Sequence, residues 1–243
     1  MPHRDRESEL VPPGACSGRE SSEGAVGVSG LPDGETAASM EGMFWVFSLC
    51  FRYPSEEVYL RLRENRGLLE LITREVTSGT PELTDLQEMQ AEYVRLMVNN
   101  YGHVPAVPYA SCYRHGEGLL MGTVQNEIAR IMRDAGRELG EDIREPADHV
   151  HLLLEFCADM AGAVRRGESG QQSFEALGTI FRGYIAPMAE PFCDNIREHA
   201  RQVFYRDLAV AFRDFVQEVL GILEGEGESI EACEQEDALC SPE

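Results

Sequence analysis

Two short polar turns contain the residues of this chain that could do chemistry. The first, residues 101–111, reads Tyr-Gly-His-Val-Pro-Ala-Val-Pro-Tyr-Ala-Ser and is hereafter the proline turn. The second, residues 145–149, reads Glu-Pro-Ala-Asp-His and is hereafter the acidic turn. Carboxylate and imidazole groups at helix ends could act as acid and base, hold a metal ion or bind a cationic peptide.

The spacing of the residues gives little support for a metal site, a catalytic nucleophile or a phosphate-binding loop. A di-iron helical bundle needs Glu-x-x-His, which does not occur, and His149 and His151 are two apart and point to different helix faces. Cys112 near His115 lacks a third catalytic member, and there is no Gly-x-Ser-x-Gly elbow. Residues 116–118 lack the spacing of a phosphate-binding loop. We therefore expect no catalytic residue, no metal site and no bound cofactor.

The acidic turn is typical of a helix start. Pro146 suits the first helical position, and Asp148 would then face unpaired N–H groups in the first turn. Apolar residues follow at helical spacing until two arginines and a glycine, residues 165–167, end the segment. Two interpretations of Asp148 stay open. It stabilises this helix start, with His149 bonded to Glu145 or to nearby backbone, or it pairs with an arginine of a bound peptide.

The elements that must position these turns are helices. Apolar residues recur at helical spacing, and no segment shows the alternation of a strand. Prolines 187 and 191 are expected to break the helical pattern near them. The predicted helices cover residues 38–52, a segment from 55, 67–76, 80–97, 117–139, 146–166, 173–188 and 194–223. The sequence thus predicts an all-α fold, a single multi-helix bundle domain.

The charge is strongly acidic and uneven. The formal net charge is −22, with 21 arginines and no lysine. Such a chain lacks the basic face of a nucleic-acid-binding protein and permits a cationic partner. We expect residues 1–40 to be a disordered extension, 41–223 the helical domain, and 224–243, with eight acids and no base, a flexible tail.

The remaining composition indicates a reducing compartment. The seven cysteines are odd in number and form no Cys-x-x-Cys pair. The N-terminus lacks an apolar signal segment, and the longest apolar run, residues 43–51, is about half the ~20 residues that cross a bilayer. We therefore expect a soluble cytoplasmic protein without stable membrane insertion.

The two turns together resemble the TorD/DmsD family of redox-enzyme maturation chaperones. The proline turn carries Pro-x-x-Pro-aromatic-x-Ser, and Glu-Pro-x-Asp-His and then Leu-Glu-Phe at 154–156 follow it. Residues 93–97 are similar to the family's Tyr-x-x-Leu-Phe helix end, and 181–205 to its later aromatic region. The resemblance covers roughly residues 41–220. It departs from the pattern at Met97, where Phe is usual, and at Met188, where Trp is usual.

The resemblance implies a non-enzymatic chaperone specific for one client. Such a protein would bind the twin-arginine leader, the apo form, or both, of a molybdopterin oxidoreductase and assist cofactor insertion before export. The client would carry the cofactor, and a weak guanine nucleotide site stays open. The positions that match the family's leader-binding surface, with apolar walls around a polar centre, are Asp148, His149, Tyr93, Leu96, Met97, Pro108, Tyr109, Ser111 and Glu145.

Two other functions remain as alternatives. A helical enzyme would use Asp148 and His149 as an acid–base pair inside a concave pocket. An assembly subunit of a nitrate-reductase-like enzyme that is not exported would bind a mature subunit without dependence on leader arginines.

Overall fold

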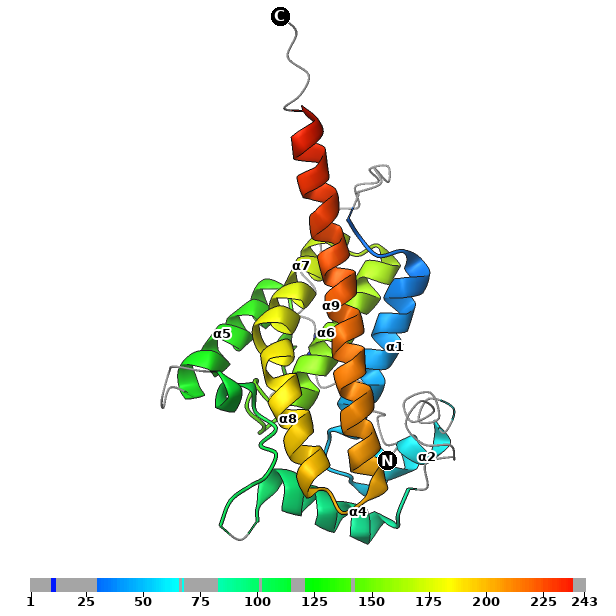
Figure 1. Ribbon diagram of the computed structural model, residues 1–243, viewed down its shortest axis with the longest axis vertical. Helices are drawn as coiled ribbons and strands as arrows, with labels where there is room; N and C mark the ends of the chain where they lie inside the picture. Colours follow the sequence, from blue (N-terminus) through cyan, green and yellow to red (C-terminus); the bar gives the residue numbers. More distant parts are fainter. Residues whose placement is uncertain are drawn as a thin grey trace, which may run out of the picture.

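The computed structural model describes residues 10–11, 30–65, 67, 83–100, 102–114, 121–140 and 143–237, and they form an α-helical bundle (Figure 1). The all-α prediction is confirmed. Apart from residue 67, the predicted helix at 67–76 lies outside the described residues, and so does most of the predicted extension. The helices are α1 (Gly34–Cys50), α2 (Glu56–Glu64), α4 (Leu86–Tyr93), α5 (Met121–Asp134), α6 (Val150–Arg166), α7 (Gly170–Ile180), α8 (Ala186–His199) and α9 (Val203–Asp237), with shorter turns η1 (Val94–Val98), η2 (Ala110–Tyr113) and η3 (Phe181–Ile185).

Helix α6 is the centre of the bundle. Its residues are buried nearly all round from Val150 to Ala163. Helix α1 packs along it in the opposite direction, since Ser48 contacts the start of α6 and Glu41 pairs with Arg165 near its end. Gly162 permits this close packing, because a Cβ there would lie 2.7 Å from a Glu41 carboxylate oxygen. A larger residue at 162 would therefore displace the Glu41 carboxylate and the Arg166 guanidinium from their present positions.

A ladder of phenylalanines joins α1 to the C-terminal helix pair. The rings of Phe44 and Phe47 lie 5.1 and 4.9 Å from the ring of Phe215, and Phe51 lies 5.0 Å from Phe212. Such aromatic contacts combine large buried area with favourable ring geometry. Helices α8 and α9 run side by side, and α9 continues beyond the other helices (Figure 1).

The predicted break at Pro187 and Pro191 is wrong. Residues 170–199 form one path, helix α7, the π-helical turn η3 and helix α8, with Pro191 inside α8. Pro191 removes the hydrogen bond to the carbonyl of residue 187. Both prolines are exposed, so water can satisfy that carbonyl.

Several predicted boundaries are also wrong. Helix α1 begins at Gly34, where Asp33 accepts the Thr36 amide, so residues 34–40 belong to the bundle. Helix α9 begins at Val203 rather than 194 and its backbone runs to Asp237, past the predicted end at 223. Helix α4 begins at Leu86 behind its cap Asp85 rather than at 80.

Helix α5 is shorter than the predicted 117–139. It ends at Asp134, and Glu138–Leu139 instead form strand β2, which pairs antiparallel with β1, Leu10–Val11. This two-residue pairing leaves the helical class unchanged. Among the described residues, no helix combines the length and apolar character that crossing a bilayer requires.

Candidate functional site

The acidic turn precedes helix α6 instead of starting it, which corrects the predicted start at Pro146. The cap is His149, whose ring accepts the His151 amide, and the helix begins at Val150. The expected meeting of Glu145 with His149 therefore does not occur, since Glu145 is exposed and His149 buried. At the other end, Gly167 adopts the left-handed conformation at φ 72°, which confirms the predicted stop.

The acidic turn and the proline turn are bonded to each other as a short antiparallel bridge. Tyr109 pairs with His149, and the Val150 amide donates to the Pro108 carbonyl at 2.8 Å. The Ala110 amide donates to the Asp148 carbonyl at 2.9 Å. The two turns that were singled out from their residues thus lie together at one end of α6.

Asp148 is the fully buried acid of this junction. Its side chain is 0% exposed, and its Oδ2 accepts the Ser111 amide at 3.2 Å. In the described part of the chain, neither Asp148 Oδ1 nor the Ser111 hydroxyl has a hydrogen-bond partner. An unsatisfied buried carboxylate oxygen is costly, about 1–3 kcal/mol or more for a charged group. The junction therefore presents an acceptor that a cationic donor would satisfy.

A second polar cluster lies directly behind it, between the start of α6 and the end of α1. The Nδ1 atoms of His149 and His151 are 2.8 Å apart, and the Ser48 hydroxyl donates to the His151 carbonyl at 3.0 Å. Arg52 forms an ion pair with the buried Glu155. Glu155 is thus a buried acid of α6 that pairs with a residue just beyond the end of α1.

The histidines of this cluster are held neutral. Burial lowers the pKa of His151 to about 3, and the Arg52 charge acts in the same direction against a weaker opposing effect of Glu155. Burial also lowers the pKa of His149 well below its usual value, with His151 and Arg52 adding to the shift. A histidine whose pKa lies far below physiological pH is a weak general base.

Tyr109 and Glu145 form the outer edge of the junction. The Tyr109 ring is half-buried and meets the His149 ring edge-on, with 5.2 Å between centroids. Burial raises the pKa of Tyr109, and the charges of Glu145 and Asp148 raise it further. These two carboxylates therefore act on the same phenol and give this edge a negative potential.

The other predicted wall residues are closed within the core. Tyr93 is 3% exposed, and its hydroxyl donates to the Phe51 carbonyl at 3.2 Å. Leu96 and Met97 are buried beside it, and Pro108 is buried under the junction. These four side chains are buried and form no exposed apolar wall.

Arg52 and Ser48 contribute to this end of the bundle but were absent from the predicted set. Each meets a residue 103 positions away, so local spacing gave no signal for them. The one available signal was a histidine and an acid, at 151 and 155, on an otherwise apolar helix, because buried polar groups need partners.

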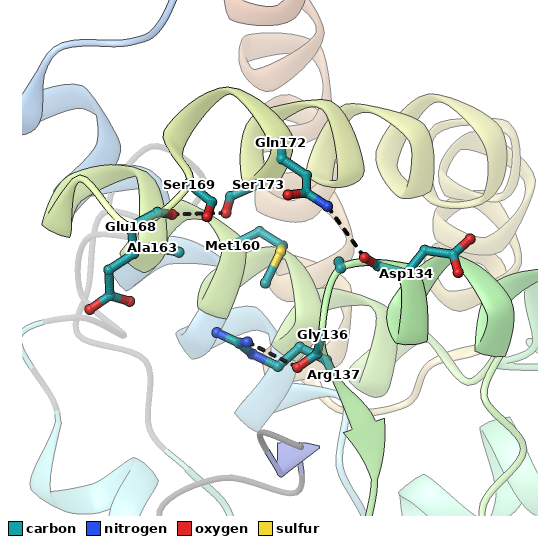
Figure 2. A pocket seen from close by; sticks show the side chains of 10 residues that line it. Asp134, Gly136, Arg137, Met160, Ala163, Glu168, Ser169, Gln172 and Ser173 are labelled. Atoms are coloured by element: carbon teal, nitrogen blue, oxygen red, sulfur yellow. Dashed lines mark hydrogen bonds between the residues drawn. The ribbon is translucent and has the colours of Figure 1, made fainter. Parts of the chain in front are cut away.

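A separate hollow of about 270 Å³ lies between α5, α6 and α7 (Figure 2). Its lining polar groups bond to one another: Gln172 donates to the Asp134 carbonyl at 3.4 Å and Ser173 to the Glu168 carbonyl at 3.2 Å. Arg137 donates to the Gly136 carbonyl and pairs with Asp159. None of the predicted site residues lines this hollow.

No group of three or more metal-ligating side chains occurs within the described ranges.

Comparison of the sequence with known proteins finds relatives. Residues 54–194 match the family described as nitrate reductase delta subunit. The chaperone protein YcdY of Escherichia coli is 28% identical over 187 residues, which cover 74% of this chain and 93% of YcdY.

More distant relatives include chaperone proteins TorD. That of Vibrio parahaemolyticus is 25% identical over 50% of this chain and 58% of its own length, and that of Vibrio vulnificus is 30% identical over 51% and 60%. A solved redox enzyme maturation protein from Archaeoglobus fulgidus superposes with a TM-score of 0.48 and 24% identity, over 73% of this chain and 93% of that one. The YcdY and TorD relatives are named chaperones, which confirms the expected non-enzymatic class. Because the family match spans more than half of the chain, the protein belongs to the nitrate reductase delta subunit family.

Proposed function

We propose that this protein is a cytoplasmic chaperone that binds a molybdopterin oxidoreductase before the cofactor is inserted, and that it recognises the client's twin-arginine leader. Its family and its named relatives support the chaperone role. In this proposal the junction of the proline and acidic turns receives an arginine of the leader. The client carries the cofactor, and this chain holds the client until it is ready for export.

The observation that carries the proposal is the carboxylate of Asp148. It is fully buried, one oxygen is held by the Ser111 amide, and the other has no partner in the described part of the chain. A guanidinium carries several N–H donors in a planar fork and forms charge-assisted bonds with carboxylates. An arginine that reaches Asp148 would satisfy the open oxygen and neutralise the buried charge.

Access to Asp148 passes beside the outer edge of the junction. Tyr109 and Ser111 are half-buried and Glu145 is exposed, so Glu145 and Tyr109 would be met first. The phenol could stack on a guanidinium, and the Glu145 carboxylate would attract it. The proline turn must then shift outward, and the bridge that holds it consists of few backbone hydrogen bonds. We propose this displacement as the step that couples leader binding to the start of α6.

The test is calorimetric titration of the full chain with a synthetic twin-arginine leader from a molybdoenzyme. Asp148→Asn keeps the shape of the side chain and one acceptor oxygen, and it should weaken binding by about 1.5–3 kcal/mol because the charged partner of the arginine is lost. The matched control is Asp194→Asn on the exposed face of α8, which should leave the affinity unchanged.

Equal affinities for the parent chain and a folded Asp148→Asn variant would refute the role of Asp148. A circular dichroism melt of each variant separates loss of binding from loss of fold.

The family description favours a second candidate, an assembly subunit for a nitrate-reductase-like enzyme that is not exported. In that case the mature client subunit binds and the leader does not. Titration with the leader and with the apo subunit lacking its leader distinguishes the two functions.

A further inference from the structure

A groove opens between α1 and α9 at the end of the bundle opposite to the junction. It encloses about 370 Å³. From Phe51 back to Phe44, the phenylalanine rings fill the space between α9 and the C-terminal half of α1. Beyond Phe44 no described ring continues the ladder, and methionines on α1 face aliphatic side chains on α9. The groove is lined by Glu35, Thr36, Ser39, Met40, Met43, Phe215, Glu218, Val219 and Ile222.

The floor of the groove is apolar and adaptable. Met40, Phe215 and Val219 are buried, and Met43 and Ile222 are half-buried along the sides. Methionine is flexible and polarisable, which suits surfaces that accept apolar side chains of differing shape. The volume is at the small end of the range for ligand pockets, about 300–1,000 Å³, and fits a few apolar side chains rather than a folded domain.

The rim of the groove is acidic. Glu35 and Glu218 are exposed on its two sides. Past the groove the backbone of α9 continues beyond the other helices (Figure 1). The sequence from 224 onward adds eight acids and no base to the net negative charge of the chain. An apolar floor beneath one-signed charge favours an occupant that is apolar on one side and cationic on the other.

We propose that the α1/α9 groove is a second docking site, which takes a cationic amphipathic helix of the client polypeptide. This inference rests on the proposed chaperone function. The walls are helices whose backbone groups are bonded internally, so they offer no edge for strand addition, whereas a helix satisfies its own backbone. A second copy of this chain is disfavoured as the occupant, because each copy carries a net charge of −22.

The groove is separate from the junction. The two sites lie at opposite ends of α1, whose 17 residues span about 25 Å. A client could therefore hold the junction with its leader arginines and the groove with a different segment. Two weak contacts on one polypeptide give higher overall affinity than either contact alone.

The experiment uses the full chain and a fluorescent synthetic peptide of about 15 residues, with leucines on one helical face and arginines on the other. Two control peptides are a scrambled sequence of the same composition and a version with glutamate in place of arginine. Fluorescence anisotropy should show the tightest binding for the amphipathic cationic peptide. Equal binding of the scrambled peptide would overturn the groove as a helix site.

Charge reversal on the rim tests the location. The double change Glu35→Lys with Glu218→Lys should raise the Kd for the cationic peptide by about tenfold and make it less dependent on salt. Both side chains are exposed, so the fold should be kept. The control Glu190→Lys lies on the exposed face of α8 and should change the Kd little. An equal effect of the control and the rim variant would overturn the proposal.

The two proposals fail in different ways. Asp148→Asn should leave binding of the amphipathic peptide unchanged, and the rim variant should leave binding of a short leader peptide at the junction unchanged. Loss of leader binding with intact groove binding would refute the function of the junction alone. The reverse result would refute the groove alone.

Discussion

The two ends of helix α1 meet the rest of the bundle in opposite ways. At its C-terminal end, Ser48 and the following Arg52 reach buried polar groups of α6. At its N-terminal end, Met40 and Met43 face an open groove with an acidic rim. One end has polar groups closed inside the protein, and the other has apolar groups within reach of solvent.

The two ends of α1 therefore suggest different roles, structural support at the polar end and binding at the groove. Buried polar groups must find partners, so the Arg52–Glu155 pair and the two histidines fix how α6 starts. That start in turn holds the bridge between Asp148 and the proline turn. An apolar groove, by contrast, gains stabilisation when something covers it. In our proposals the polar end therefore positions the junction, and the open end provides the docking groove.

The largest expected effect concerns the start of α1. Deleting residues 1–40 removes the Asp33 cap and the buried Ala37 and Met40, and it should lower the free energy of unfolding by about 4 kcal/mol. Deleting residues 1–29 keeps all of these and should change it little. Urea unfolding of both truncations measures the difference, and equal stabilities would show that the start of α1 does not support the bundle.

The next effect concerns the polar end. Glu155→Ala leaves Arg52 partly buried beside the two histidines and should lower the free energy of unfolding by about 3 kcal/mol, the low end of the usual range because Arg52 is 23% exposed. The matched control is Glu57→Ala, which breaks the exposed pair with Arg61 and should cost at most about 0.5 kcal/mol. If Glu155→Ala and Glu57→Ala lose similar amounts of stability in chemical denaturation, the Arg52–Glu155 pair stabilises the fold no more than an exposed ion pair does.

A smaller effect follows from pH. Unfolded histidine takes up a proton near pH 6.5, whereas folded His151 does so only near pH 3. As the pH falls below about 6.5, the unfolded state binds protons that the folded state refuses. The free energy of unfolding should then fall by about 1.4 kcal/mol per pH unit for each buried histidine, in addition to other acid effects.

The comparison of parent and His151→Gln isolates the contribution of that histidine. Urea midpoints measured at several values between about pH 7 and pH 4 should fall less steeply in the variant, because glutamine cannot take up the proton. Parallel curves would show that His151 is already protonated, or accessible, in the folded protein.

Local signals in the sequence predicted the fold class and some helix ends. Ser55 caps α2 as expected, and Gly167 ends α6. The predicted start of α6 was wrong for a local reason. Proline is a strong sequence signal for the first helical position, which favoured Pro146, whereas histidine is not a strong signal for a helix cap. The predicted helix break at Pro191 was wrong because a helix tolerates an internal proline where the freed carbonyl can reach water. That exposure depends on how α8 packs, which local sequence does not show.

The candidate site was predictable in its centre but not in its surroundings. Asp148, His149, Tyr109 and Ser111 do lie together. That Leu96 and Met97 are closed in the core could not be read from spacing, since an apolar residue suits both a core and a groove wall. Arg52 reaches Glu155 across 103 positions, and such a contact is set by how α1 packs on α6.

The central claim, that Asp148 receives a leader arginine, is tested most directly by a double-mutant cycle. Calorimetric titration would combine the parent chain and Asp148→Asn with the twin-arginine leader and its twin-lysine version. The account predicts that the two changes are coupled by about 1–2 kcal/mol, because each removes one side of the same charge-assisted contact. Additive effects, with a coupling near zero, would contradict it.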